Sequence, residues 1–402
     1  MSSRRVMITG AGIVCSIGTD FAEFTESLRV GRNAAGPIQS MDASEVAGAL
    51  GCEALDFDPH QHFSARELQR MDRSSKMAVV AAREAMAMAG LSHGDVDADY
   101  TAVSLGSTLG GSVNYQKFYQ SYRERGKGRK ALLLDQQLYV PGNRIAHEFG
   151  FGGGGYVFSN ACASSNSAMA YAHDLITIGD ADVVITGGFD TMAKMTVAGF
   201  NIMRNVSPTA CRPFDKNRDG LILGEGAGII VLESEEHMLR RGGVPMAEFL
   251  GYGQSTDAKH MTAPDPTAKG PAAAVSNALK AAKVEPQQLD YINGHGTGTP
   301  HNDASEARAI HRVFGDYAHE VPVSSTKSMH GHCLGATGGI EAVTMLAAIR
   351  NGFVPGTPTF QTPDDPPLPG IRQESHERDV KITMSNNFGF GGSNSTVVFG
   401  RV

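Results

Sequence analysis

The sequence predicts an α/β protein in which several layers of helices and strands are stacked. Short apolar runs alternate with helical stretches along the whole chain, a pattern typical of α/β layers. The pattern restarts after residue 243, which suggests two halves of similar make-up. The 402 residues include 48 glycines and only 7% aromatic residues, so we expect an aliphatic core with many tight turns and close backbone approaches.

The elements of the first half follow from its apolar runs. Residues 6–9 predict a strand that enters a glycine turn. Residues 63–91 are predicted to be rich in helix, and their alanines would permit close packing. Further along, the sequence predicts a helix at 163–178 and strands at 100–106, 156–159, 182–187 and 228–233.

The second half repeats this pattern, and we place the division between residues 1–242 and 243–402. Two long segments, 114–139 and 355–378, are expected to run over the surface. The predicted helices cover 271–283 and the residues after Gly335, and the predicted strands cover 291–294, 321–324, 380–385 and 395–399.

Composition excludes several classes of protein. A net charge of −7 argues against a general nucleic-acid binder. No run of 18 apolar residues occurs, so no membrane span is expected, and glycines interrupt the apolar N-terminal run in a way that signal peptides do not show. The five cysteines form no CxxC pair, so neither a disulfide framework nor a zinc knuckle is expected. We therefore expect a soluble, cytoplasmic protein with reduced thiols.

Cys162 is the first candidate for chemistry. It lies in SNACASSNSA (159–168), where a short strand is predicted to run into a helix of small residues. A thiol at a helix N-terminus has its pKa lowered from about 8.5, and backbone N–H groups there could hold an oxyanion. The alternative is a buried structural cysteine.

Two histidine motifs and one glycine-rich motif strengthen that candidate. His295 lies in NGHGTGTP (293–300) and His332 in KSMHGHCLG (327–335), each just past a predicted strand. Histidine carries protons near neutral pH and donates well to a developing enolate. In NNFGFGGSN (386–394), glycines would let main-chain N–H groups approach a ligand, although an ordinary turn between strands is the alternative.

Taken together, these motifs resemble the elongating β-ketoacyl-acyl-carrier-protein synthases of the thiolase superfamily. The resemblance covers essentially the whole chain, from VMITGAGIVCSIG through CRPFDKNRDGLILGEGAG to NNFGFGGSN. The Cys-His-His pattern separates this group from initiating synthases, which carry Cys-His-Asn, and from thiolases, which carry a second catalytic cysteine. The resemblance implies a duplicated thiolase-like fold of five layers, α-β-α-β-α.

The resemblance also implies a reaction, a decarboxylative Claisen condensation. Cys162 would take an acyl chain from the phosphopantetheine arm of an acyl carrier protein. A malonyl-carrier would then lose CO₂, with His295 and His332 stabilising the enolate that attacks the acyl thioester. The backbone N–H groups of Cys162 and Phe390 would form the oxyanion hole. No metal and no redox cofactor is required.

Other residues match supporting positions of the family. Lys327 matches a lysine behind the second histidine, and Glu306 and Glu341 match acidic residues that pair with it or order its loop. A surface charge on a helix is the alternative for Glu341. Thr297 and Thr299 match hydroxyls that bind the pantetheine amides, with turn geometry as their alternative.

The acyl channel and the docking surface are implied in the same way. Phe390 matches the gate of the channel, and Phe200 and Leu109 match positions that line or close it. Because the carrier is acidic, docking needs a local basic patch. As a bare charge run, residues 122–130 would be a solvated loop. The positions that match the carrier-facing surface are Arg66, Arg70, Arg129, Lys130 and Arg204.

Departures from the family bear on the pathway. Gly294 replaces the more usual Ala or Thr, and His301 and His330 add imidazoles that we interpret as non-catalytic, as we do the thiol of Cys333. Residues 141–149 look shorter than in fatty-acid enzymes, near the expected dimer interface. A fatty-acid, polyketide or polyene chain is therefore left open.

The partner is also left open between a second copy and a homologous subunit, paired through the strand before Cys162. One rival function is a non-condensing chain-length factor, which normally lacks the cysteine. A second is a thiolase or an initiating synthase, against which the histidine pair argues. A third is a protein that only binds the carrier.

Overall fold

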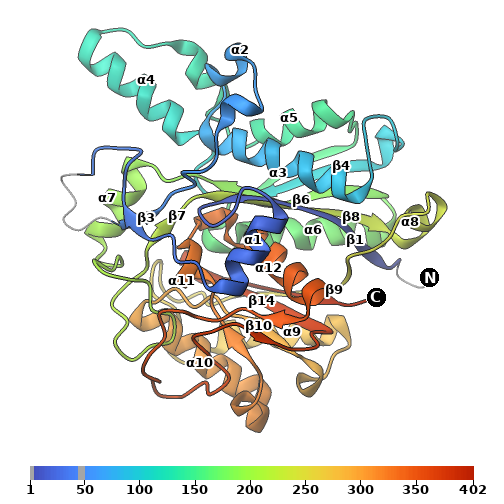
Figure 1. Cartoon of the computed structure of the whole chain (residues 1–402), viewed down its shortest axis with the longest axis vertical. Helices are drawn as coiled ribbons and strands as arrows, with labels where there is room; N and C mark the ends of the chain where they lie inside the picture. Colours follow the sequence, from blue (N-terminus) through green and yellow to red (C-terminus); the bar gives the residue numbers. More distant parts are fainter. Residues whose placement is uncertain (1–3, 44–49) are drawn as a thin grey trace.

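The computed structural model describes residues 4–43 and 50–402, and a large mixed sheet organises the chain (Figure 1). Its ten strands run in the order β11-β10-β14-β15-β9-β1-β8-β6-β4-β5. They are β1 (Val6–Cys15), β4 (Thr101–Gly106), β5 (Gly154–Phe158), β6 (Val183–Asp190), β8 (Gly226–Ser234), β9 (Ala247–Thr256), β10 (Tyr291–Asn293), β11 (Val323–Ser324), β14 (Ile382–Gly389) and β15 (Ser393–Gly400). One small sheet consists of β2 (Gly36–Pro37), β3 (Leu50–Cys52) and β7 (Leu223–Gly224). Another consists of β12 (Phe353–Val354) and β13 (His376–Glu377).

The large sheet consists of two five-stranded halves with the same topology. From its outer edge inward, the first half has the order β5-β4-β6-β8-β1, and the second half has the order β11-β10-β14-β15-β9. If the strands of each half are numbered 1 to 5 along the chain, both orders are 3-2-4-5-1. The halves meet where β1 pairs antiparallel with β9, at Met7↔Glu248 and Ile8↔Ala247. The repeated order supports a duplicated chain, and the division at residues 242 and 243 stays a prediction.

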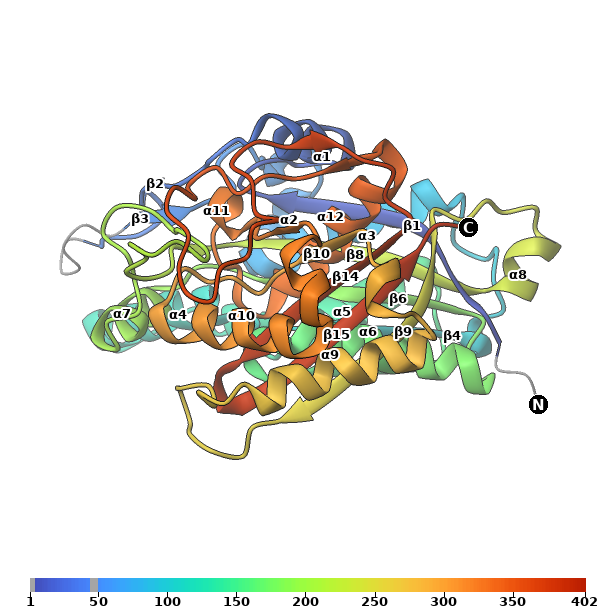
Figure 2. The ribbon, with the colours of Figure 1, turned by 90° about the horizontal axis from the view of Figure 1, so that it is seen from below.

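Helices complete five layers. α3 (Arg73–Ala89) and α5 (Val140–Phe149) cover the outer face of the first half-sheet. α6 (Ser164–Ile178) and α12 (Thr337–Asn351) lie between the half-sheets and contact both. α9 (Lys269–Ala282) and α10 (Pro300–Phe314) form the outer layer on the second half (Figures 1 and 2). The other α-helices are α1 (Phe21–Val30), α2 (Ala65–Leu68), α4 (Ser112–Arg125), α7 (Lys194–Ile202), α8 (Glu235–Arg240) and α11 (Lys327–His330).

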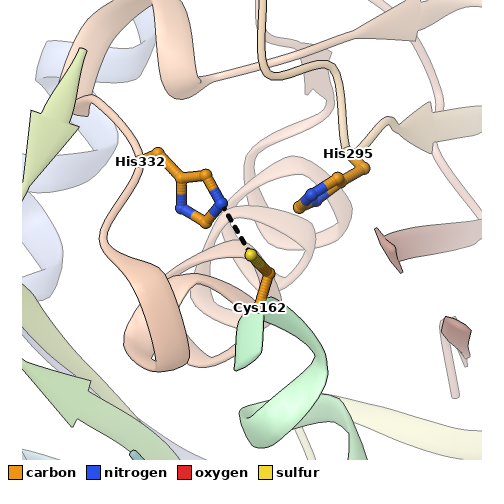
Figure 3. Close-up of side chains that lie close together, drawn as sticks. All are labelled: Cys162, His295 and His332. Atoms are coloured by element: carbon orange, nitrogen blue, oxygen red, sulfur yellow. Dashed lines mark hydrogen bonds between the residues drawn. The ribbon is translucent and has the colours of Figure 1, made fainter. Parts of the chain in front are cut away.

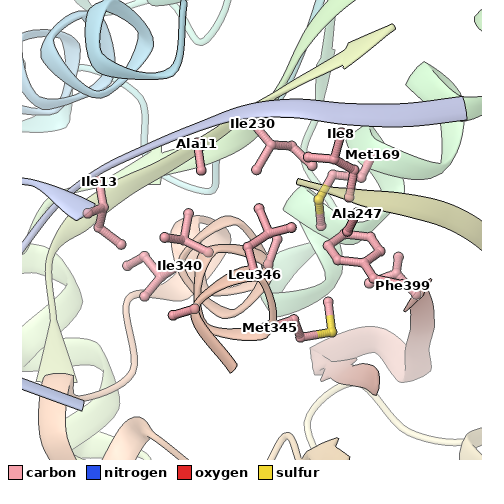
Figure 4. Packing of buried hydrophobic residues seen from close by; sticks show 14 of the residues in the cluster. Ile8, Ala11, Ile13, Met169, Ile230, Ala247, Ile340, Met345, Leu346 and Phe399 are labelled. Carbon is pink, nitrogen blue, oxygen red and sulfur yellow. The ribbon is translucent and has the colours of Figure 1, made fainter. Parts of the chain in front are cut away.

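The central layer is the most deeply buried part of the core. In α12 every residue from Thr337 to Ile349 is buried, because strands or helices contact all of its faces. Ile340 and Leu346 of α12 face Ile13 and Ile230 of the first half-sheet (Figure 4). A helix enclosed in this way must be apolar or small all round, which explains its low amphipathicity.

The prediction of a glycine turn after residue 9 is wrong, because β1 continues to Cys15. A Cβ atom at Gly10 would lie 2.0 Å from the Ala85 carbonyl oxygen, and one at Gly12 would lie 2.0 Å from that of Ala81. These glycines therefore let the backbone of α3 pack directly on the strand. The predicted close packing of the alanine-rich helix is confirmed.

The two predicted surface segments differ from one another. Residues 114–139 contain most of α4, which projects from the body of the molecule, and a 3₁₀ helix at Lys130–Asp135 (Figure 1). Residues 355–375 contain neither helix nor strand. Among the described residues, no helix is both long enough and apolar enough to cross a membrane.

Candidate active site

Three buried side chains from distant parts of the chain converge (Figure 3). Cys162 lies in a 3₁₀ turn, Ala161–Ala163, between β5 and α6. His295 follows β10, and His332 lies between α11 and α12. The His332 Nε2 atom is 3.0 Å from the Cys162 sulfur, and the two imidazole rings lie 5.4 Å apart and almost perpendicular. The structure thus brings together the three residues that the sequence singled out.

A strained turn positions the thiol. Ala161 adopts φ of +54°, a left-handed conformation that is uncommon for a residue with a side chain. The Ser164 hydroxyl stabilises the turn by accepting from the Asn160 N–H at 3.0 Å and donating to the Ala161 carbonyl oxygen at 2.6 Å. The chain can therefore leave β5 and enter α6 with Cys162 at the cavity.

The prediction of a lowered thiol pKa is wrong. Burial raises the pKa of Cys162 to about 11, although the Lys327 charge and the backbone N–H groups of Phe390 and Cys162 act to lower it. Desolvation of the thiolate outweighs these donors, because protein atoms replace most of the water that would surround an exposed sulfur. The same two N–H groups are the predicted oxyanion-hole donors, and both lie within hydrogen-bonding reach of the sulfur.

The tautomer of His332 follows from its surroundings. The Leu334 backbone N–H donates to His332 Nδ1 at 3.0 Å, so Nδ1 is an acceptor. Burial and the Lys327 charge hold the pKa of His332 well below its usual range, so the ring is neutral. Its single proton is therefore on Nε2, and Nε2–H is a donor facing Cys162.

His295 is held through its backbone rather than its ring. Glu306 accepts hydrogen bonds from the backbone N–H groups of His295 and Gly296, each at 2.8 Å. Burial and the Lys327 charge also keep the pKa of His295 well below its usual range. Its Nδ1 atom is buried and has no hydrogen-bond partner among the described residues.

Lys327 and Glu341 form a fully buried ion pair. The second carboxylate oxygen of Glu341 accepts from the Ser385 hydroxyl at 3.0 Å and from the Asn387 amide at 2.8 Å. The surface charge considered for Glu341 is therefore excluded. Glu306, in contrast, orders the loop of His295 and contacts Asn386.

A small cavity of about 70 Å³ connects these residues. Cys162, His295 and His332 line it, and the rings of Phe200 and Phe390 stack 5.7 Å apart at its wall.

The glycine-rich motif is the turn of the β14–β15 hairpin. Gly391 and Gly392 have φ of +83° and +74°, which favour glycine. The Gly391 N–H donates to the Met261 carbonyl oxygen at 2.7 Å, and the Asp257 N–H donates to that of Gly392 at 2.9 Å. The predicted gate is thus a hairpin turn that is hydrogen-bonded to a neighbouring loop.

Of the four residues that are expected to bind the pantetheine arm or the acyl chain, three line the cavity and one does not. Thr297 and Thr299 both line the cavity, and their hydroxyl oxygens lie 2.8 Å apart. Phe200 also lines it, whereas Leu109 does not, and both pack against one small apolar cluster that contains Leu334. Leu109 therefore shapes the wall indirectly in this structure.

The five predicted docking residues are all exposed. Arg129 donates to the Gln69 side chain at 3.0 Å, which joins the α4 segment to the residues next to Arg70. Arg66 lies in α2, and Arg204 follows α7. The basic positions Arg66, Arg70, Arg129 and Lys130 therefore share one region of the surface.

The contacts of His330, His301 and Cys333 show which of these additional residues lie at the cavity. Both ring nitrogens of His330 are bonded, to the Gly331 carbonyl and the Thr326 hydroxyl, whereas His301 lines the cavity. Burial raises the pKa of Cys333 well above its usual range, and this thiol does not line the cavity.

Sequence reasoning missed two buried carboxylates beside the site. Asp303 accepts from the backbone N–H groups of Thr297 and Gly298, at 3.0 and 3.1 Å. It lies three residues before Glu306 in α10, and that spacing, which puts both on one helix face, was the available signal. Asp190 ends β6, and no pattern in the sequence indicated it.

Comparison with known proteins identifies the family of the chain. Residues 3–238 match the family model "Beta-ketoacyl synthase, N-terminal domain", and residues 246–361 match "Beta-ketoacyl synthase, C-terminal domain". The chain belongs to the β-ketoacyl synthase family, and it is a condensing acyltransferase with the thiolase-like fold that the sequence predicted.

Three individual proteins illustrate the range of similarity. Nodulation protein E of Rhizobium meliloti (strain 1021) is 38% identical over 403 residues, covering 99% of this chain and 100% of the relative. The 3-oxoacyl-[acyl-carrier-protein] synthase 2 of Staphylococcus aureus (strain N315) is 38% identical over 406 residues, covering 99% and 98%. The solved structure of the ishigamide ketosynthase/chain length factor has a TM-score of 0.94 at 36% identity and covers all of both chains.

Proposed function

We propose that this protein is a β-ketoacyl-[acyl-carrier-protein] synthase that lengthens an acyl chain on Cys162 by two carbons. The observation that carries the proposal is the 3.0 Å contact between the Cys162 sulfur and the protonated Nε2 of a neutral His332. The pair lines a cavity that His295 also lines. The name of the Staphylococcus aureus relative supports the carrier protein as the donor of substrate.

The first step is acyl transfer. The Cys162 sulfur attacks the carbonyl carbon of an acyl-carrier thioester, and the backbone N–H groups of Cys162 and Phe390 hold the oxyanion. The carrier sulfur leaves with the electron pair of the broken bond and takes up the proton that Cys162 gives up. Thr297 and Thr299 would bind the amides of the carrier's pantetheine arm.

The second step is decarboxylation and condensation. A malonyl-carrier loses CO₂, and the electron pair of the broken bond forms an enolate whose oxygen accepts from His295 and His332. The enolate carbon then attacks the acyl group on Cys162, so a C–C bond forms and the sulfur leaves as a thiolate. Neutral donors suit an enolate that exists only briefly, and the lowered pKa values of both rings support this role.

No metal and no redox cofactor takes part in this scheme. The bonds formed and broken balance without one. The Cys162 sulfur and one nitrogen of each histidine nevertheless lie within 4.8 Å of one another, a spacing that a metal ion could bridge. Activity that survives exhaustive dialysis against EDTA supports the metal-free scheme, and activity restored only by added Zn²⁺ would overturn it.

Partners and location belong to the same proposal. The acidic carrier would dock on Arg66, Arg70, Arg129, Lys130 and Arg204. A second copy or a homologous subunit would pair along β5, one of the two edge strands of the large sheet, which is only half-buried. The similarity to bacterial carrier-dependent synthases supports action in the cytoplasm.

Intact-mass spectrometry with acyl-carriers of several lengths tests the function. We expect an acyl adduct that is lost in Cys162→Ser. His295→Ala and His332→Ala should still be acylated but fail to release CO₂ from malonyl-carrier. His311→Ala, on the outer helix layer, serves as the control. Absence of any adduct would indicate a non-condensing partner subunit, and normal decarboxylation by a histidine variant would remove that residue from the mechanism.

A further inference from the structure

Asp190 is a fully buried carboxylate at the end of β6, beside the site but outside its cavity. Its Oδ1 atom accepts from the Ser107 hydroxyl at 2.8 Å and from the backbone N–H of Leu109 at 2.9 Å. Its Oδ2 atom accepts from the backbone N–H groups of Thr108 at 2.8 Å and Gly335 at 2.7 Å. Burial raises the pKa of this carboxyl to about 6, although these donors act to lower it.

The two segments that Asp190 joins both serve the site. One is the loop after β4, in which Leu109 packs against the same small apolar cluster as Phe200, a residue of the cavity wall. The other is the turn into α12, in which the N–H of Leu334 sets the tautomer of His332. Gly335 follows Leu334 directly, and a Cβ atom at Gly335 would lie 2.6 Å from Asp190 Oδ2. The carboxylate therefore lies between the acyl wall and the enolate donor.

We propose that Asp190 is a positioning residue that fixes Leu109 and His332 relative to each other, and so sets both chain-length preference and decarboxylation. This rests on the proposed function. Three of the four donors are backbone N–H groups, so most of the fixed distances are those of the main chain rather than of mobile side chains. Nothing in the carboxylate touches the cavity, which makes its effect on the reaction indirect.

Asp190→Asn is the informative variant. In the wild type, both carboxylate oxygens of Asp190 accept from backbone N–H groups. The side-chain amide of the asparagine variant has one oxygen and one NH₂ group, so in either orientation its NH₂ group faces at least one N–H donor and cannot bond to it. The local loops must shift to separate these donors. We expect acylation by the preferred chain length and CO₂ release from malonyl-carrier to fall by about tenfold to a hundredfold. The ratio of acylation rates between short and long acyl-carriers should also change.

Two comparisons keep the test sharp. Glu233→Gln changes another buried carboxylate at the opposite end of the same half-sheet, where Glu233 bonds to His237 and Arg241. It should lower the melting temperature without changing the chain-length ratio. Ser107→Ala removes one donor to Asp190, so it should also change the ratio of acylation rates between short and long acyl-carriers, by a smaller factor than Asp190→Asn. This variant provides the test if Asp190→Asn does not fold.

The inference is overturned if Asp190→Asn folds and keeps the wild-type ratio and CO₂ release. It is also overturned if Glu233→Gln changes both quantities equally, or if Asp190→Asn does not fold and Ser107→Ala leaves the ratio unchanged. Each of these results would leave the proposed function intact, provided that the wild-type protein is acylated on Cys162. A wild-type protein that is not acylated would instead refute the function itself.

Discussion

At Cys162, burial and the surrounding donors act in opposite directions. Because burial raises the pKa of the thiol to about 11, only a small fraction is thiolate at neutral pH. Reaction of the free enzyme therefore depends on a thiolate population that grows with pH. When the substrate carbonyl binds, the Lys327 charge and the backbone N–H groups of Cys162 and Phe390 are already in place to stabilise a short-lived thiolate.

Labelling of Cys162 tests this residue. Its alkylation by iodoacetamide should rise about tenfold per pH unit between pH 7 and 9, because the thiolate fraction rises in that proportion well below the pKa. Peptide mapping at each pH checks the rate and the site. Cys162 should react before the other four cysteines, since it lines the cavity. A rate that is already constant above pH 7 would contradict the raised pKa.

The Lys327–Glu341 pair gives a second prediction at this scale. Glu341→Leu leaves a buried, unpaired ammonium and should lower the free energy of unfolding by about 3–5 kcal/mol. The double variant Lys327→Met/Glu341→Leu should recover most of that loss, because no charge then stays buried. Urea denaturation of both variants measures the difference. A single variant as stable as the wild type would mean that the pair is not desolvated.

Among the elements, the β14–β15 turn has two roles at the site, one through the ring of Phe390 and one through its backbone N–H. Its glycines hold left-handed conformations, and its Phe390 ring stacks on Phe200 while the Phe390 N–H faces the Cys162 sulfur. A turn that supplies both a ring and an N–H can close the cavity and complete the oxyanion hole in one movement. That the turn moves during the reaction stays a proposal.

Phe390→Ala separates the two roles, because it removes the ring and keeps the N–H. We expect acylation of Cys162 to persist, while the discrimination that makes acyl transfer precede malonyl decarboxylation is lost. Rates of CO₂ release before and after acylation measure this. Gly391→Pro is the complementary variant, since proline holds φ near −65° where the turn has +83°. It should block acylation, and normal acylation in a folded variant would show that the turn is no gate.

For the whole molecule, charge distribution matters more than net charge. The chain is acidic overall, at −7, yet the five side chains that are proposed to face the carrier are basic and exposed. Attraction of an acidic partner to a local patch is screened beyond about 10 Å at 0.1 M salt. Docking of the carrier should therefore depend on ionic strength, even though the protein as a whole repels anions.

Reversing two charges tests the surface. Arg129→Glu/Lys130→Glu should raise the KM for acyl-carrier and weaken its salt dependence, and should leave acylation by a small pantetheine thioester unchanged. Lys280→Glu, on the exposed face of the opposite helix layer, is the matched control. Steady-state kinetics at two salt concentrations suffice. Equal losses with both substrates would show that these residues act on the structure rather than on docking.

Much of the fold was predictable, because hydrophobic periodicity and glycine punctuation are local signals. The strands near residues 100, 183, 228 and 291 and the helices near 164 and 269 lie within a few residues of their predicted bounds. The glycines of β1 were misinterpreted, because their purpose is contact with α3, some 70 residues away. The helix within 114–139 was missed, because a polar, exposed helix has no apolar stripe to indicate it.

The sequence by itself determined the layered α/β class, the reactive residue types and their placement on glycine-rich strand exits. The tertiary structure decided which groups meet there: the 3.0 Å contact of His332 with Cys162, the burial that raises rather than lowers the thiol pKa, and the carboxylate of Asp190 that joins two loops. Periodicity and turn chemistry act over a few residues and can be recognised along the chain. Desolvation and long-range hydrogen bonds depend on what packs around a group, and only the folded chain supplies that.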